Sequence, residues 1–156
     1  MTHIILLGDS IFDNAHYTEG GPEVIAQVRQ LMPKGWRATL LALDGAMTEH
    51  IPSQLERVPA NASHLVLSVG GNDALMRSSM LQAQVGCVSQ AVQVLAEASR
   101  EFEAKYRLAV AACRQLGLPL TLCTIYNGCF PDPDFQPIAS TAVMVFNDVI
   151  LRVGIE

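Results

Sequence analysis

Short apolar runs that end in clusters of Gly, Asp or Asn alternate with amphipathic segments along this chain. Residues 3–8 end in Gly-Asp-Ser, residues 37–43 precede Asp-Gly, and residues 64–69 precede Gly-Gly-Asn-Asp. A fourth run, residues 118–126, precedes Asn127. Apolar runs of this length, bounded by turn residues, are typical of buried parallel strands. Because strands and helical segments alternate, the sequence predicts an α/β layered fold with a parallel sheet.

Four helical segments are expected between and after the strands, at residues 22–32, 48–58, 81–116 and 138–153. Thr48 is expected to cap the second segment. The third is expected to break near Ser99, because helices longer than about 25 residues are uncommon in globular domains. Two ion pairs at i,i+4 spacing are predicted on the third segment, Glu101 with Lys105 and Glu103 with Arg107.

Composition narrows the possible functions. The chain has 156 residues, of which 50% are hydrophobic and 16% charged, so it fits one domain with a sizeable core. A net charge of −5 without a basic run argues against nucleic-acid binding. No apolar stretch is expected to reach the roughly 20 residues that span a bilayer, and no cationic signal peptide precedes the first strand. A cytoplasmic protein without membrane contact is therefore predicted.

Metal chemistry is not expected from the cysteines. The chain has four of them, and none forms a C-x-x-C pair or has a histidine close to it in sequence. This spacing does not fit a zinc site, so no metal is predicted. Cofactor motifs are absent as well, and no cofactor is expected.

The polar loops after the first three strands are expected to meet at one edge of the sheet, where open α/β sheets bind ligands. The first loop offers the hydroxyl of Ser10, just past a strand end. The second offers the backbone N–H of Gly45, which no side chain blocks. The third offers the amide NH₂ of Asn72. A hydroxyl nucleophile surrounded by donors is the arrangement that acyl transfer requires, since the donors hold the developing oxyanion.

These loops resemble the conserved blocks of the SGNH, or GDSL, hydrolases, a family of esterases and lipases. Gly8-Asp9-Ser10 is similar to the first block, residues 44–48 to the second, and Gly70-Gly71-Asn72-Asp73 to the third. The resemblance implies Ser10 as nucleophile and an oxyanion hole of the Ser10 N–H, the Gly45 N–H and the Asn72 side chain. It also implies supporting roles for Asp9 and Asp73, and a three-layer flavodoxin-like sheet of order 2-1-3-4-5.

The final block of the family, Asp-x-x-His after a fifth strand, has no counterpart here. No histidine follows His64, so the usual general base is missing. We expect residues 1–156 to form a single domain of this family that is truncated at its C-terminus, with sheet order 2-1-3-4. The alternative is a natural short form that uses another base or has lost activity. Without a fifth strand, strand 118–126 is an apolar edge of the sheet, so a homodimer through this edge is predicted.

The four histidines offer no obvious substitute for the missing base. Asp13-Asn14-Ala15-His16 matches Asp-x-x-His as a string, but it lies in the first loop and is interpreted as coincidence. His50 is interpreted as a solvated helix residue. His3 and His64 begin strands, at the opposite end from the polar loops, and are interpreted as structural.

Two features near the fourth strand are candidate substrate contacts. Tyr126 and Asn127 lie at its end and are predicted to flank the substrate, although a tyrosine at a strand end also serves in packing. Residues 128–135 contain two phenylalanines and form either an apolar wall over an acyl group or an ordinary connection stiffened by prolines.

The function predicted from the sequence is hydrolysis of a small-molecule ester through an acyl-serine intermediate on Ser10. The alternative is a catalytically inactive relative of the same fold that binds an acyl or carboxylate group. A nucleotide-binding domain ranks last, because the chain has neither G-x-G-x-x-G nor a P-loop sequence.

Overall fold

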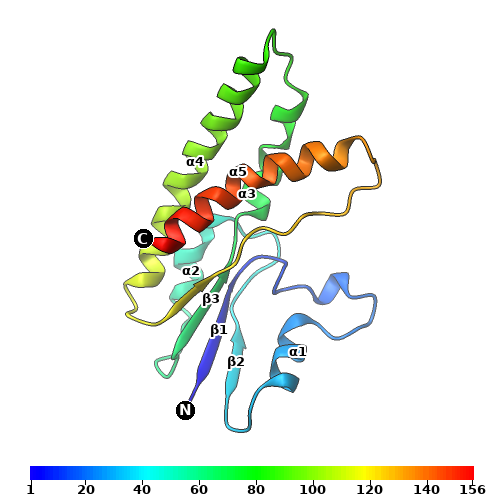
Figure 1. Ribbon diagram of the computed structural model, residues 1–156. Coiled ribbons are helices and arrows are strands. Elements are labelled where there is room, and N and C mark those ends of the chain that lie inside the picture. The colour runs from blue at the N-terminus through cyan, green and yellow to red at the C-terminus, as the bar shows by residue number, and fades with distance from the viewer.

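A computed structural model describes all 156 residues and contains a single four-stranded sheet (Figure 1). All strand pairs are parallel, and the order is β2-β1-β3-β4. The predicted α/β class and strand order are therefore confirmed. The strands are β1 (His3–Gly8), β2 (Arg37–Leu40), β3 (His64–Ser68) and β4 (Leu120–Leu122).

Helices cover the two faces of this sheet unequally (Figure 1). Helix α1 packs beside β1 and β2 on one face, around a small cluster of five buried residues. Helices α2, α4 and α5 lie on the other face and enclose a core of 17 buried residues. The helices are α1 (Val24–Leu31), α2 (Ile51–Leu55), α3 (Gly71–Met76), α4 (Val88–Arg114) and α5 (Phe135–Ile155).

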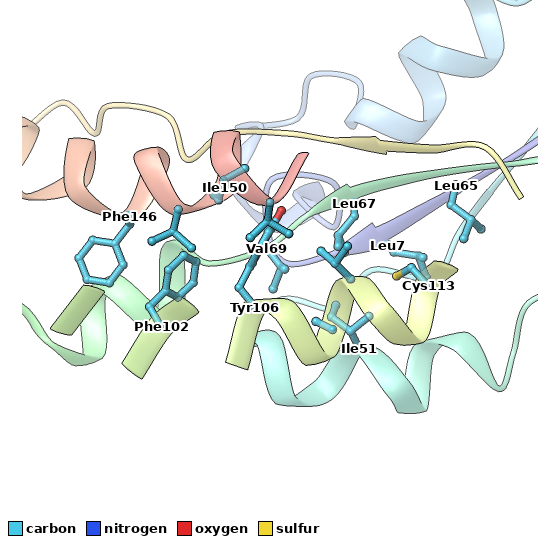
Figure 2. Close-up of a cluster of buried hydrophobic side chains, with 14 of the residues drawn as sticks. Leu7, Ile51, Leu65, Leu67, Val69, Phe102, Tyr106, Cys113, Phe146 and Ile150 are labelled. Carbon is cyan, nitrogen blue, oxygen red and sulfur yellow. The ribbon is translucent and has the colours of Figure 1, made fainter. Parts of the chain in front are cut away.

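The larger core joins α4 and α5 to the sheet (Figure 2). Phe102 on α4 packs edge-on against Phe146 on α5, with ring centroids 5.2 Å apart. The ring of Tyr106 lies 5.3 Å from that of Phe102 and is completely buried. Alternate residues of β1 and β3 complete the layer, because successive side chains of a strand point to opposite faces. These strand residues are Ile5, Leu7, Leu65 and Leu67.

Helix α5 is long and apolar enough to cross a membrane by length and composition alone. The expectation that no stretch of the chain reaches this length is therefore wrong. A third of its most apolar 18-residue window is buried, and the buried side chains belong to the large core. Core helices commonly meet the same criterion, so the helix by itself does not indicate a membrane span.

Several element boundaries differ from those predicted. The edge strands β2 and β4 are shorter than the runs 37–43 and 118–126. Helix α4 continues through Ser99 without a break and has 27 residues, although it begins only at Val88. A helix that the pattern did not predict, α3, begins inside the third polar loop.

One of the two predicted ion pairs on α4 is confirmed. The Nη2 of Arg107 lies 2.8 Å from Oε1 of Glu103. The other pair is wrong, because Glu101 contacts Arg77 and Lys105 Nζ lies 3.8 Å from Glu49 Oε2. Both side chains therefore connect α4 to other segments that begin at the polar edge of the sheet.

Candidate active site

The loop that carries Ser10 leaves β1 at a glycine that no other residue could replace. Gly8 has φ +130°, and a Cβ atom there would lie 1.7 Å from the carbonyl oxygen of Ser68 on β3. The chain then turns sharply, since the backbone N–H groups of Phe12 and Asp13 both donate to the Asp9 carbonyl at 3.1 Å. This turn leaves Ser10 half-buried at the carboxyl edge of the sheet.

The side chain of Gln54, on helix α2, holds the carboxyl end of β1 in place. Its side chain is completely buried. The Gly8 N–H donates to Gln54 Oε1, and Gln54 Nε2 donates to the Gly8 carbonyl, both at 2.8 Å. One side-chain amide thus satisfies both backbone groups of the residue two positions before Ser10. This contact was not predicted, because nothing in the local sequence pattern pairs residue 54 with residue 8.

Asp9 lies beneath the loop and is only 4% exposed. Its Oδ1 accepts a hydrogen bond from the Ile11 N–H at 3.1 Å. Burial raises the pKa of Asp9 to about 6, an effect that the Ile11 hydrogen bond opposes and the neighbouring Asp73 increases. A buried carboxyl group beside a serine hydroxyl is therefore neutral or charged depending on pH near 6.

The third loop is held to the second by two side chains. Asn72 Nδ2 donates to the Ala46 carbonyl at 2.9 Å. The Asp73 carboxylate accepts from the Thr48 N–H at 3.1 Å and from Thr48 Oγ1 at 2.7 Å. The prediction that Thr48 caps a helix is thus wrong, because its hydroxyl binds Asp73 instead. These bonds orient the Asn72 carboxamide, since one of its two N–H groups is engaged and the other is free to donate.

Ser10 and Asn72 line the same cavity, of about 60 Å³, at the carboxyl edge of the sheet. Asp9 and Tyr126 line it as well, and Tyr126 is 63% exposed at its mouth. The remaining lining residues come from the end of β3, from the segments that follow β1, β3 and β4, and from α3: Ile11, Ser68, Val69, Gly71, Leu75, Thr124 and Ile125. The first and third polar loops therefore converge as expected.

Gly45, Asp73 and Asn127 do not line this cavity. Gly45 has φ +76° in an exposed turn directly before Ala46, whose carbonyl binds Asn72. Asp73 is buried behind Asn72, and Asn127 is exposed. The oxyanion role of the Gly45 N–H and the substrate contact of Asn127 stay predictions.

No histidine lines the cavity. His3 is buried at the other end of β1, where its ring nitrogens lie 2.9 Å from Asn61 Oδ1 and 2.8 Å from Thr39 Oγ1. His50 Nδ1 accepts from the Met47 N–H at 2.9 Å. His16 and His64 are exposed, and His64 begins β3. The imidazole that would deprotonate Ser10 is therefore not among the residues around it.

A larger apolar cavity, of about 270 Å³, adjoins the Ser10 cavity. Twelve of its 15 lining residues are hydrophobic. Phe130 of the loop after β4 and Phe135, the first residue of α5, are among them, with ring centroids 5.1 Å apart and nearly perpendicular planes. Residues 128–135 thus contribute an apolar wall to this cavity, and the position of this wall over an acyl group stays a prediction.

No group of three or more His, Cys, Asp or Glu side chains is arranged to hold a metal ion, and all four cysteines are free thiols. The side chains that line the Ser10 cavity offer a hydroxyl, a carboxamide and a buried carboxyl group.

Solved structures of ester hydrolases share this fold. An extracellular lipase from Streptomyces rimosus superposes with a TM-score of 0.66 at 17% identity, over 98% of this chain and 76% of the lipase. The acetyl xylan esterase AlAXEase gives a TM-score of 0.66 at 18% identity, over 97% and 71%. Phospholipase A1 from Streptomyces albidoflavus NA297 gives 0.65 at 15% identity, over 97% and 75%.

The sequence itself matches no family model and no curated protein. At identities of 15 to 18%, the likeness to these three structures concerns the fold. The chain has the α/β fold of the SGNH/GDSL-type hydrolases, and its structural neighbours are esterases and lipases.

Proposed function

We propose that this protein is an ester hydrolase in which Ser10 is the nucleophile. The observation that carries the proposal is the shared cavity of the Ser10 hydroxyl and the Asn72 carboxamide. Ser10 Oγ forms a bond to the carbonyl carbon of the ester and gives up its proton to a base. The Asn72 N–H and the Ser10 and Gly45 backbone N–H groups stabilise the oxyanion. The ester C–O bond then breaks, the leaving oxygen takes the proton from the base, and the alcohol departs. Water then hydrolyses the acyl-serine, which releases the acid and restores the Ser10 hydroxyl.

Covalent labelling with a fluorophosphonate tests the nucleophile directly, because the reagent forms a bond to an activated serine oxygen and releases fluoride. Intact-mass measurement is expected to find one adduct, which Ser10→Ala removes. Ser79→Ala, at an exposed serine outside the cavity, is the matched control and is expected to keep the adduct. Added imidazole is expected to accelerate labelling, since it supplies the base that the cavity lacks.

The Asn72→Ala variant tests the oxyanion donor. Removal of one such donor typically slows the acylation step by ~10²–10³, so labelling of this variant is expected to slow by that order. An adduct that survives in Ser10→Ala, or equal labelling rates for Asn72→Ala and the unmodified chain, would contradict the proposed mechanism. Circular dichroism of each variant establishes that the fold is retained.

The second candidate function is binding of an acyl or carboxylate group without turnover. It is favoured by the absence of any histidine from the cavity lining. Under this alternative, small carboxylates bind the protein while Ser10 forms no adduct, even with imidazole present. The labelling experiment therefore separates the two candidates.

A further inference from the structure

The apolar cavity beside Ser10 is bounded by three segments of the chain. Helix α3 and the 3₁₀ turn after it, Ser78–Gln82, form one side, and the loop after β4 forms the second. Helix α5 supplies the floor, with four residues on one helical face. These floor residues are Ala139, Ala142, Val143 and Phe146. A volume of about 270 Å³ with this lining is suited to an apolar ligand.

The two cavities are adjacent, because four residues line both of them: Gly71, Leu75, Ile125 and Tyr126. Gly71 directly precedes Asn72, so the junction lies beside the proposed oxyanion donor. An acyl group bonded to Ser10 would therefore lie beside residues that also line the apolar cavity.

The wall of the apolar cavity is held in place by the side chain of Gln136. The Phe130 N–H donates to Gln136 Oε1 at 2.8 Å, and Gln136 Nε2 donates to the Gly128 carbonyl at 3.0 Å. The loop that carries Phe130 is thus tied to the first turn of α5. These hydrogen bonds restrain the loop, which lowers the ordering cost of binding.

We propose that this cavity binds the acyl chain of the substrate, and that the substrates are esters of medium-length, unbranched aliphatic acids. The proposal rests on the proposed function, since it places the ester carbonyl at Ser10. A cavity of about 150 Å³ lined by aliphatic residues holds benzene. By that comparison, this cavity accommodates on the order of eight to ten carbons. An acetyl group would leave most of the apolar surface without a ligand contact.

Ala139 and Ala142 set the depth of the cavity in this proposal. Both are less than 10% exposed, and their small side chains leave the space above the α5 floor open. A leucine at either position adds three carbon atoms to that space. We expect Ala139→Leu and Ala142→Leu to shorten the longest chain that binds well by about two or three carbons, in proportion to the volume lost.

Binding of straight-chain carboxylates from acetate to dodecanoate, measured by isothermal titration calorimetry, tests the proposal. Each buried methylene is expected to raise the affinity about fourfold until the cavity is full. The two leucine variants are expected to reach their maximum at shorter chains. Ala104→Leu, the same substitution at an exposed position of α4, is the matched control and is expected to behave like the unmodified chain.

Affinity that does not rise with chain length would overturn the proposal. So would leucine variants whose chain-length profiles equal that of Ala104→Leu. Thermal unfolding of each variant identifies any that does not fold, and the two positions give independent tests. Carboxylate binding needs no turnover, so it tests the acyl cavity alone. Labelling of Ser10 tests the proposed function. Failure of one measurement is therefore distinguishable from failure of the other.

Discussion

The carboxyl group of Asp9 links the pH of the medium to the stability of the loop that carries Ser10. Burial raises its pKa from 3.8 to about 6, so folding favours the protonated form. Its contribution to stability is therefore complete below about pH 4 and is lost as pH rises through 6. We expect Asp9→Asn, which keeps the oxygen that accepts from Ile11, to melt higher than the unmodified chain at pH 8, and by a smaller margin at pH 4.

At pH 8, the free energy of unfolding of Asp9→Asn is expected to exceed that of the unmodified chain by at most about 3 kcal/mol. This limit is the free-energy equivalent of the rise in the Asp9 pKa from 3.8 to about 6. Thermal unfolding followed by circular dichroism between pH 4 and pH 8 measures it. Asp134→Asn, at an exposed aspartate just before α5, is the matched control. If Asp9→Asn changed the melting temperature equally at both ends of this range, the buried carboxyl group would not be the cause.

Single residues could be predicted where the neighbouring sequence alone indicates their position in the fold. Ser10 and Asn72 were predicted to meet because each follows the carboxyl end of a parallel strand, and both line one cavity. Gln54 and Thr48 gave no such signal. Their partners, Gly8 and Asp73, are 46 and 25 residues away in sequence, and only the packing of helices on the sheet brings them together.

At the scale of helices, Glu103 joins α4 to α5. It accepts from Arg107 Nε at 2.8 Å within α4 and from Arg152 Nη2 at 2.9 Å on α5. Arg107 Nη1 also donates to Glu156 at 2.5 Å. The hydrogen bonds from Arg152 and Arg107 lower the pKa of Glu103 to about 2. This network therefore fastens the C-terminal end of α5 to the interior of α4.

We expect Glu103→Gln to lower the melting temperature at pH 7 by roughly 2–4 °C, equivalent to about 1 kcal/mol for exposed ion pairs in a chain of this size. Because the folded pKa is depressed, the difference is expected to persist above about pH 4.5 and to disappear as pH falls towards 2. Glu97→Gln, in a looser pair with Arg100 at 3.9 Å, is the control. A loss that is unchanged in 1 M NaCl would argue against an electrostatic origin.

The central elements were more predictable than those at the edges of the sheet. The range of β1 was predicted in full and that of β3 within one residue, because both strands are apolar on two faces. The edge strands β2 and β4 each pair with one neighbour, β1 and β3 respectively, and their lengths depend on how far this pairing continues. The length of an apolar run in the sequence does not indicate where the pairing stops. Helix α4 passes Ser99 because its apolar face continues on both sides, from Ala98 to Phe102.

For the whole molecule, the open side of β4 is the feature with the clearest consequence. This strand pairs with β3 alone, and its outer backbone groups have no strand partner. The face of the sheet that carries α1 has only five buried core residues, against 17 on the other face. Unpaired edges of this kind favour association with another strand. The predicted homodimer through the edge 118–126 accordingly stays a prediction.

We expect sedimentation velocity to give the mass of a dimer for the unmodified chain and of a monomer for Thr121→Lys. Thr121 is exposed on β4, and a lysine on an edge strand opposes strand pairing between chains. Thr141→Lys, on the exposed side of α5, is expected to leave the dimer intact. A monomeric mass for the unmodified chain across micromolar concentrations would exclude the interface.

The double hydrogen bond between Gln54 and Gly8 makes the position of the loop that carries Ser10 depend on helix α2. A five-residue helix has little stability of its own, and it holds here by packing on the core. Any thermal opening of α2 breaks its hydrogen bonds to both backbone groups of Gly8. The turn that positions the Ser10 hydroxyl is then no longer held by this helix. The position of the Ser10 hydroxyl therefore depends on how often α2 opens, although no residue of this helix lines the Ser10 cavity.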